Sequence, residues 1–176
     1  NQFANENNIL SHYETTGPEI YSQTNGEVDV FVAGLGTTGT VIGVGRYLKE
    51  QNPSIKIVAV EPFEGHTIQG LKNMTESIVP AIYKPKELDE IVMVDDDEAF
   101  EIARKLSTNA GLFVGMSSGA AVAGALRLAR DMDSGTIVVI LPDRGDRYLS
   151  TTLFLPICRK CPPQVHRFIN TITYLF

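Results

Sequence analysis

The hydrophobic positions along the chain form short apolar runs that alternate with longer segments of helical character. Four runs rich in β-branched residues are expected to form strands, and they span residues 28–33, 56–60, 91–94 and 136–141. Three segments between them are expected to form helices, and they span residues 39–51, 95–109 and 120–130. Apolar strands that alternate with helices are typical of a parallel sheet buried on both faces. The pattern therefore predicts a three-layer α/β fold with a mainly parallel sheet.

The chain before the first strand is less regular. Residues 1–11 are rich in asparagine, and we expect them to be extended or looped. Residues 11–24 carry helix-forming side chains around Pro18, which indicates a short helix that follows Pro18 or spans it. Asn25-Gly26 is a turn signal that ends this helix before the first strand.

The connection between the first strand and the first long helix is rich in glycine and threonine. Its sequence is Gly34-Leu35-Gly36-Thr37-Thr38-Gly39-Thr40. Backbone N–H groups at the start of a helix lack intrahelical partners, and glycine lets an anionic ligand approach them closely. The threonine hydroxyls add hydrogen-bond donors, which suit a compact phosphate monoester. This turn is therefore a candidate phosphate-binding loop.

Two other interpretations of the loop remain open at this point. The spacing Gly34-x-Gly36-x-x-Gly39 matches a dinucleotide-binding fingerprint, and Glu61 lies about 20 residues further on, where such a site has a ribose-binding acid. The loop could equally be a tight turn without a ligand. Because ligands of parallel sheets bind at the carboxyl ends of the strands, we expect residues 34–40, 115–119 and 142–148 to meet there.

Composition narrows the classes of protein. The chain has 176 residues, 43% of them hydrophobic and 20% charged, which suits one globular domain with a buried core. Its net charge of -6, without a basic stripe, argues against nucleic acid as a partner. No run of 18 apolar residues predicts a membrane span, and the polar first residues do not resemble a signal peptide. A cytoplasmic location is therefore expected.

No metal site is expected. Cys158 and Cys161 form a CxxC pair followed by His166, but a structural zinc site needs four ligands. The acidic residues 95–98 lack the spacing of a calcium-binding loop, so they are expected to begin a helix. The serine pair at 117–118 is likewise expected to cap the helix that follows it.

Several segments together resemble the cysteine synthase and cystathionine β-synthase family of pyridoxal-phosphate enzymes. In chain order these segments are Gln2-Phe3, Asn7-Asn8, His12-Tyr13, 15–20, 36–40, 60–62, 68–71, 117–121, and 142–143 with 147–151. The resemblance covers about residues 1–154 and implies the tryptophan-synthase-β-like fold, PLP fold type II. It matches the second half of such an enzyme, so we expect an incomplete sheet. It divides the chain into an interdomain segment (1–11), a large domain that binds the cofactor phosphate (12–154) and a C-terminal tail (155–176).

The resemblance also assigns roles to individual residues. Those that hold the phosphate of pyridoxal 5'-phosphate are Gly36, Thr37, Thr38, Gly39 and Thr40. Ser117 hydrogen-bonds the pyridine nitrogen, Gln2 and Gly70 contact the amino-acid substrate, and Asp143 and Tyr148 lie near the ring. The family has a glycine where this chain has Thr38, so the loop is expected to be slightly altered there.

The family's catalytic lysine lies in a serine-x-lysine motif upstream of the matched segment, together with a threonine-serine-glycine-asparagine loop. We expect neither motif in this chain, and therefore no catalytic residue and no activity of the chain alone. The implied reaction of the whole enzyme, a homodimer, is β-replacement of O-acetylserine or O-phosphoserine by sulfide to give L-cysteine.

Two alternatives remain: a cystathionine β-synthase, or a non-catalytic remnant that keeps the phosphate loop. Residues 166–173 faintly resemble the start of cysteinyl-tRNA synthetases, and an unrelated extension is the other interpretation of this tail.

Overall fold

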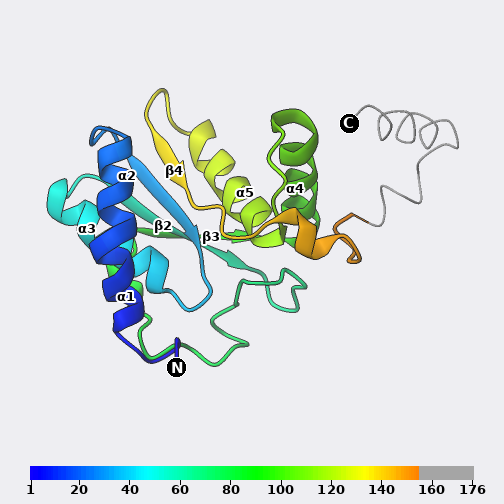
Figure 1. The fold of residues 1–176 in the computed structure, drawn as a ribbon, viewed down its shortest axis with the longest axis horizontal. Coiled ribbons are helices and arrows are strands. Elements are labelled where there is room, and N and C mark those ends of the chain that lie inside the picture. The colour runs from blue at the N-terminus through cyan, green and yellow to red at the C-terminus, as the bar shows by residue number, and fades with distance from the viewer. Residues whose placement is uncertain (155–176) are drawn as a thin grey trace, which may run out of the picture.

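A computed structural model describes residues 1–154 and contains one four-stranded sheet within them (Figure 1). The expectations for Cys158, Cys161, His166 and the rest of the tail lie outside the described residues. The strand order is β3-β2-β1-β4, and every neighbouring pair is parallel. The strands are β1 (Val30–Gly34), β2 (Lys56–Pro62), β3 (Glu90–Val94) and β4 (Ile137–Val139). The prediction of a parallel sheet is confirmed.

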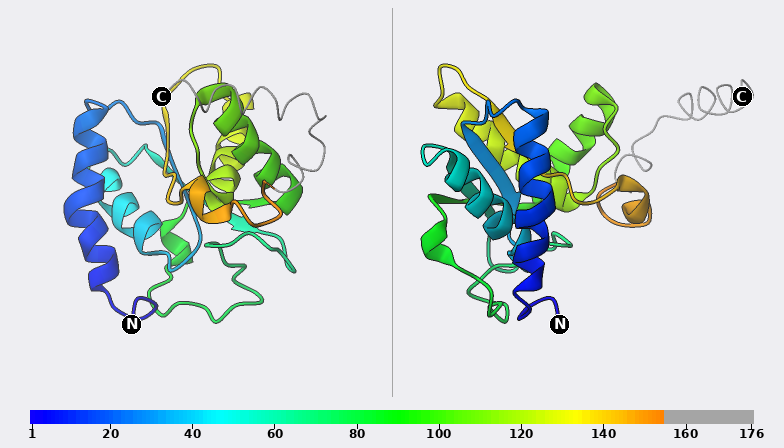
Figure 2. Two further views of the ribbon diagram at one scale, coloured as in Figure 1. Left: turned by 45° about the vertical axis from the view of Figure 1, so that its right-hand side comes forward. Right: turned by 60° about the vertical axis from the view of Figure 1, so that its left-hand side comes forward.

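Helices cover both faces of this sheet, as two turned views show (Figure 2). Alternate residues of β1 point to opposite cores: Phe31 packs with the N-terminal helices, and Val32 packs with the later helices. The helices of the first layer are α1 (Asn7–Ser11), α2 (Gly17–Gln23) and α3 (Gly39–Gln51). Those of the other layer are α4 (Asp96–Ala110) and α5 (Met116–Arg130). The predicted three-layer α/β architecture is confirmed.

The prediction of an extended or looped segment over residues 1–11 is wrong for its second part. Asn7–Ser11 is helical and continues through a π-helical segment, η1 (His12–Thr16), into α2. Asparagine is a weak helix former, but Ile9 is only 2% exposed against α3, and packing outweighs local propensity. In the π segment the Gly17 N–H bonds to the carbonyl of His12, and this wider turn lets the helix continue into Pro18.

A long connection without a long helix joins β2 to β3, and side chains hold its shape. Glu61 Oε1 accepts the N–H of Met74 at 2.6 Å, and Asn73 Nδ2 donates to the Pro62 carbonyl at 2.9 Å. Both carboxylate oxygens of Glu76 accept the N–H of Gly65. The connection ends in a short 3₁₀ helix, η2 (Pro85–Glu87). These bonds keep residues 63–76 against the carboxyl edge of the sheet.

The strand β4 is shorter than the predicted run of residues 136–141. It pairs only with β1 and lies at the edge of the described sheet, where its residues are half-buried rather than covered on both faces. The 3₁₀ helix η3 (Gly145–Tyr148) follows it. Among residues 1–154, no helix is both long and apolar enough to cross a membrane.

Candidate functional site

The glycine-rich loop lies where the strand order changes direction. β1 has β2 on one side and β4 on the other, so the loop after β1 opens at a topological switch point, where open parallel sheets bind ligands. A cavity of about 290 Å³ is found there. Its lining residues are Gln2, Ala33, Gly34, Gly36, Thr37, Thr38, Thr40, Gly70, Leu71, Ile140 and Pro142. The structure thus brings together most of the residues that the sequence singled out.

Thr38 occupies the most constrained position in this loop. Its φ of 73° lies in the left-handed region, where glycine is favoured, and it is the N-cap of α3. Its hydroxyl is buried and has no hydrogen-bond partner among the residues that the structure describes. Thr38 thus adopts a backbone angle at which glycine is favoured, and the expected alteration of the loop stays a prediction. A buried donor without a partner costs free energy, so this hydroxyl fits a site completed by a ligand.

The neighbouring threonines are held by the N-terminal helical segment, which the sequence interpretation did not place in the site. Asn8 Nδ2 donates to Thr37 Oγ1 at 3.0 Å. His12 Nε2 lies 3.1 Å from Thr40 Oγ1, and its Nδ1 lies 2.9 Å from Thr16 Oγ1. Burial lowers the pKa of His12, which favours its neutral form. The available signal was the four-residue spacing of Asn8 and His12, which puts both on one helix face.

Gly36, Gly70 and Ser117 are brought together by close backbone contacts. A Cβ on Gly36 would lie 3.0 Å from the Gly70 carbonyl oxygen, and a Cβ on Gly70 would lie 3.3 Å from Ser117 Oγ. Gly70 also has a φ of 93°. The predicted meeting of the loops at the carboxyl edge is therefore confirmed. Gly39 does not line the cavity. Its Cα faces the Asn8 side chain, and a Cβ built on Gly39 would lie 2.1 Å from Asn8 Oδ1.

The start of α5 is capped by a residue distant in sequence, which corrects the expectation for the serine pair. Gly115 is the N-cap, and the serines lie inside the first turn. The Asp143 carboxylate accepts the N–H of Ser117 at 3.1 Å and the N–H of Ser118 at 2.9 Å, and Ser118 Oγ donates to it at 2.5 Å. A carboxylate binds these N–H groups more strongly than a serine hydroxyl would. Burial, aided by the nearby Asp143 charge, raises the pKa of Tyr148 to about 12.

The three long helices therefore begin differently. Asp95 caps α4 by accepting the Glu98 N–H at 2.8 Å, as its acidic start predicts, and Asp143 caps α5. Within the part of the chain that the structure describes, no side chain caps the start of α3, and its first helical bond is from the Ile42 N–H to the Thr38 carbonyl, at 3.1 Å. Free N–H groups, the positive end of the helix dipole and the unpartnered Thr38 hydroxyl together fit a phosphate group.

The expectation that no serine-x-lysine triplet occurs is wrong at the level of sequence, because Ser54-Ile55-Lys56 has this form. Lys56, however, begins β2 and pairs with the first residue of β1, at the end of the sheet opposite the phosphate loop. A strand of this length separates the two ends by roughly 15 Å. Its Nζ forms an ion pair with Glu90 at 2.5 Å. This lysine cannot reach the cavity at the carboxyl edge.

The dinucleotide interpretation finds no support at Glu61. Its carboxylate is nearly buried and accepts the Met74 N–H, so it is already used to shape the β2–β3 connection. Within the described part of the chain, no group of three or more potential ligands could hold a metal ion.

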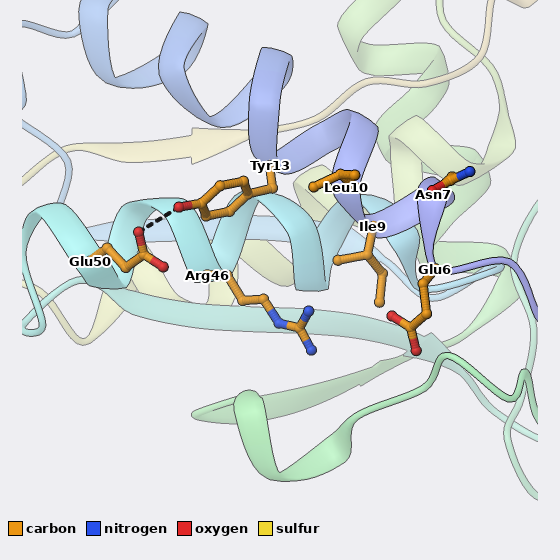
Figure 3. Close-up of a pocket in the computed structure, with 7 residues that line it drawn as sticks. All are labelled: Glu6, Asn7, Ile9, Leu10, Tyr13, Arg46 and Glu50. Carbon is orange, nitrogen blue, oxygen red and sulfur yellow. Dashed lines mark hydrogen bonds between the residues drawn. The ribbon is translucent and has the colours of Figure 1, made fainter.

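A second hollow, of about 380 Å³, lies between the N-terminal helical segment and α3 (Figure 3). Tyr13 donates to Glu50 at 2.6 Å in this hollow, as Figure 3 shows, and Arg46 forms a bidentate ion pair with Glu87. Tyr13 and Glu50 are thus bonded to each other and Arg46 is bonded to Glu87, so these three groups are already paired, and we interpret the hollow as a contact region between helices.

Comparisons with known proteins agree with the site at the sheet edge. A family model described as pyridoxal-phosphate dependent enzyme matches residues 1–143. Cysteine synthase B of Pseudomonas aeruginosa is 48% identical over 155 residues, covering 88% of this chain and 52% of that protein. Cysteine synthase A of Escherichia coli is 42% identical, covering 87% of this chain and 53% of that protein.

Solved structures give the same picture. Cysteine synthase of Entamoeba histolytica superimposes with a TM-score of 0.81 at 42% identity, covering 87% of this chain and 48% of that one. An O-ureido-L-serine synthase has a TM-score of 0.84 at 38% identity, covering 93% and 54%. The chain spans about half the length of the relatives it matches. On the sequence match and the shared architecture, the chain belongs to the family of pyridoxal-phosphate dependent enzymes.

Proposed function

We propose that this chain is the part of a cysteine synthase that binds the cofactor phosphate. The observation that carries the proposal is the uncapped start of α3 at the switch point, with the buried, unpartnered Thr38 hydroxyl beside it. The similarity to cysteine synthases A and B supports the same reaction class. The proposal keeps the assignment of Gly36, Thr37, Thr38, Gly39 and Thr40 as the residues that hold the phosphate.

Ser117 is the proposed partner of the pyridine nitrogen. When bound, pyridoxal phosphate supplies an electron sink that allows a leaving group to depart from the β-carbon of an amino-acid substrate. A neutral serine does not keep the ring nitrogen protonated as a carboxylate would, so the sink is weaker. This favours β-replacement over transamination. Ser117 Oγ lies beside the Gly70 backbone, 3.3 Å from a Cβ built there, which places it near the phosphate loop.

The proposed substrates are O-acetylserine or O-phosphoserine, and sulfide. Sulfide adds to the β-carbon, acetate or phosphate leaves, and L-cysteine is the product. Gln2 and Gly70 line the same cavity as the phosphate loop and are proposed to contact the amino acid. The proposal places the lysine that the family uses in the remainder of the full-length protein. That protein is proposed to be a cytoplasmic homodimer.

The test uses the full-length protein, loaded with pyridoxal phosphate and supplied with each activated serine and sulfide. Formation of L-cysteine is expected, and Thr40→Val is expected to weaken cofactor binding about tenfold, since a hydrogen bond to a charged group is worth about 1.5 kcal/mol. Thr108→Val is the matched control, because the Thr108 hydroxyl bonds only within its own part of α4.

Two results would contradict the proposal. Equal cofactor affinity of the Thr40 variant and the control would remove the phosphate assignment. Formation of cystathionine from serine and homocysteine, without cysteine formation from sulfide, would favour the alternative of a cystathionine β-synthase.

A further inference from the structure

The side chain of Asn8 is enclosed between the N-terminal segment and the phosphate loop. Its Nδ2 lies 2.9 Å from the Gln2 carbonyl oxygen and 3.0 Å from Thr37 Oγ1. Its Oδ1 lies against the Cα of Gly39, where a built Cβ would come within 2.1 Å. The carboxamide therefore contacts the loop at Thr37 and Gly39 as well as the segment that carries Gln2.

The orientation of this carboxamide follows from its partners. A backbone carbonyl oxygen only accepts hydrogen bonds, so the atom facing Gln2 must be the donor nitrogen. The same nitrogen faces Thr37 Oγ1, and an amide nitrogen does not accept a hydrogen bond, so Thr37 must be the acceptor. The Thr37 hydroxyl hydrogen is thereby kept away from the Asn8 contact. It is available for an acceptor in the cavity, which Thr37 lines.

We propose that Asn8 is a positioning residue that directs the Thr37 hydroxyl hydrogen toward the cofactor phosphate. This inference rests on the proposed function of the loop and adds a residue that lies outside it. Asn8 touches neither the phosphate nor the substrate in this account. It acts by donating a hydrogen bond to Thr37 Oγ1, so that the Thr37 hydroxyl hydrogen is left to be donated to the phosphate.

Two substitutions at Asn8 separate this role from simple packing. Asn8→Asp keeps the shape of the side chain but replaces the donor by an acceptor, which draws the Thr37 hydrogen to itself and adds a negative charge beside the phosphate site. Asn8→Ala removes the contact and leaves Thr37 free to rotate. If Asn8 acts only by packing, Asn8→Ala should weaken binding of pyridoxal phosphate more than Asn8→Asp. If Asn8 positions the Thr37 hydroxyl, Asn8→Asp should weaken it more.

The experiment measures dissociation constants of the full-length protein for pyridoxal phosphate and for pyridoxal, which lacks the phosphate, by equilibrium dialysis. We expect Asn8→Ala to raise the constant for pyridoxal phosphate about fivefold and Asn8→Asp about fiftyfold, in line with the strength of charge-assisted hydrogen bonds. The constant for pyridoxal is expected to change less than about twofold in both variants. With Thr37→Val as the background, Asn8→Ala is expected to have no further effect.

Each contrary result has a distinct meaning. An Asp variant that binds pyridoxal phosphate like the unchanged protein, or better than the Ala variant, would overturn the positioning role. Equal losses for pyridoxal phosphate and pyridoxal would overturn it as well, because the effect would not act through the phosphate. If Thr40→Val also leaves the affinity for pyridoxal phosphate unchanged, the proposed phosphate loop itself fails.

Discussion

The helices α3 and α5 begin at the same edge of the sheet, with similar small-residue sequences, yet their first turns differ. The start of α5 is closed, because the Asp143 carboxylate accepts two backbone N–H groups and the Ser118 hydroxyl. The start of α3 is open, because no side chain caps it and the Thr38 hydroxyl is buried without a partner in residues 1–154. Among residues 1–154, the protein supplies its own anion to the start of α5 and none to the start of α3, where we propose that the cofactor phosphate binds.

This difference shows why glycine- and serine-rich turns are ambiguous in sequence. Gly36-Thr37-Thr38-Gly39 leads into α3, and Gly115-Met116-Ser117-Ser118 forms the N-cap and the first residues of α5. Among residues 1–154, only the second has its N–H groups bound by a carboxylate, and that carboxylate comes from the loop after β4. A helix start stays available to a ligand when the fold brings no internal acceptor to it.

The largest expected effect is the loss of stability on removing the carboxylate that caps α5. Asp143→Ala leaves two N–H groups and one hydroxyl without their acceptor and is expected to lower the free energy of unfolding by about 3 kcal/mol. Asp143→Asn keeps one acceptor oxygen and should cost about half as much. Urea denaturation of the three proteins measures this order. Equal stability of all three would show that solvent caps α5 as well as Asp143 does.

Asp143→Asn also tests the electrostatics at Tyr148. Burial is the main cause of the pKa of about 12, and the Asp143 charge adds to it. Loss of the charge should lower the pKa toward the ordinary value of 10.0 without reaching it, because burial remains. Absorbance of the phenolate during alkaline titration reports the shift.

A smaller change in stability, of opposite sign, is expected at the start of α3. Thr38→Gly relieves the left-handed backbone and is expected to raise the free energy of unfolding of the cofactor-free protein by about 0.5 kcal/mol, after the added flexibility of glycine is subtracted. The same change removes the buried hydroxyl and should weaken binding of pyridoxal phosphate about fivefold. Thermal denaturation and cofactor titration measure the two effects. A variant that is more stable and binds equally well would show that the hydroxyl has no ligand.

The smallest effect concerns pH. Burial lowers the pKa of His12 below the ordinary 6.5, so the unfolded chain takes up a proton at a higher pH than the folded one. The contribution of His12 to stability is therefore complete above about pH 6.5 and is lost as the pH falls toward the folded pKa. The stability advantage over His12→Gln should shrink between about pH 7.5 and about pH 5.5 in denaturation experiments. An advantage that grows on acidification would contradict this.

The sequence predicted the features that depend on neighbours in the chain. The alternation of apolar runs and their β-branched residues located the strands, and Asp95 marked the start of α4. The glycines and threonines of residues 34–40 marked the loop before α3. The features that it missed depend on contacts distant in sequence. Asp143 reaches the start of α5 across the sheet edge, and the helix at Asn7–Ser11 exists because Ile9 is buried against α3. Neither contact leaves a local pattern.

The close approach of the first helical segment to α3 limits where the chain can bend. A Cβ on Gly43 would lie 2.3 Å from the Ile9 carbonyl oxygen, so the two backbones are in contact with no side chain between them. This close contact opposes sliding or tilting of the segment against α3. Movement of Gln2 relative to α3 is then confined to residues 3–6. We propose that a substrate-driven movement of Gln2 pivots on these residues, whose far end is fixed to α3.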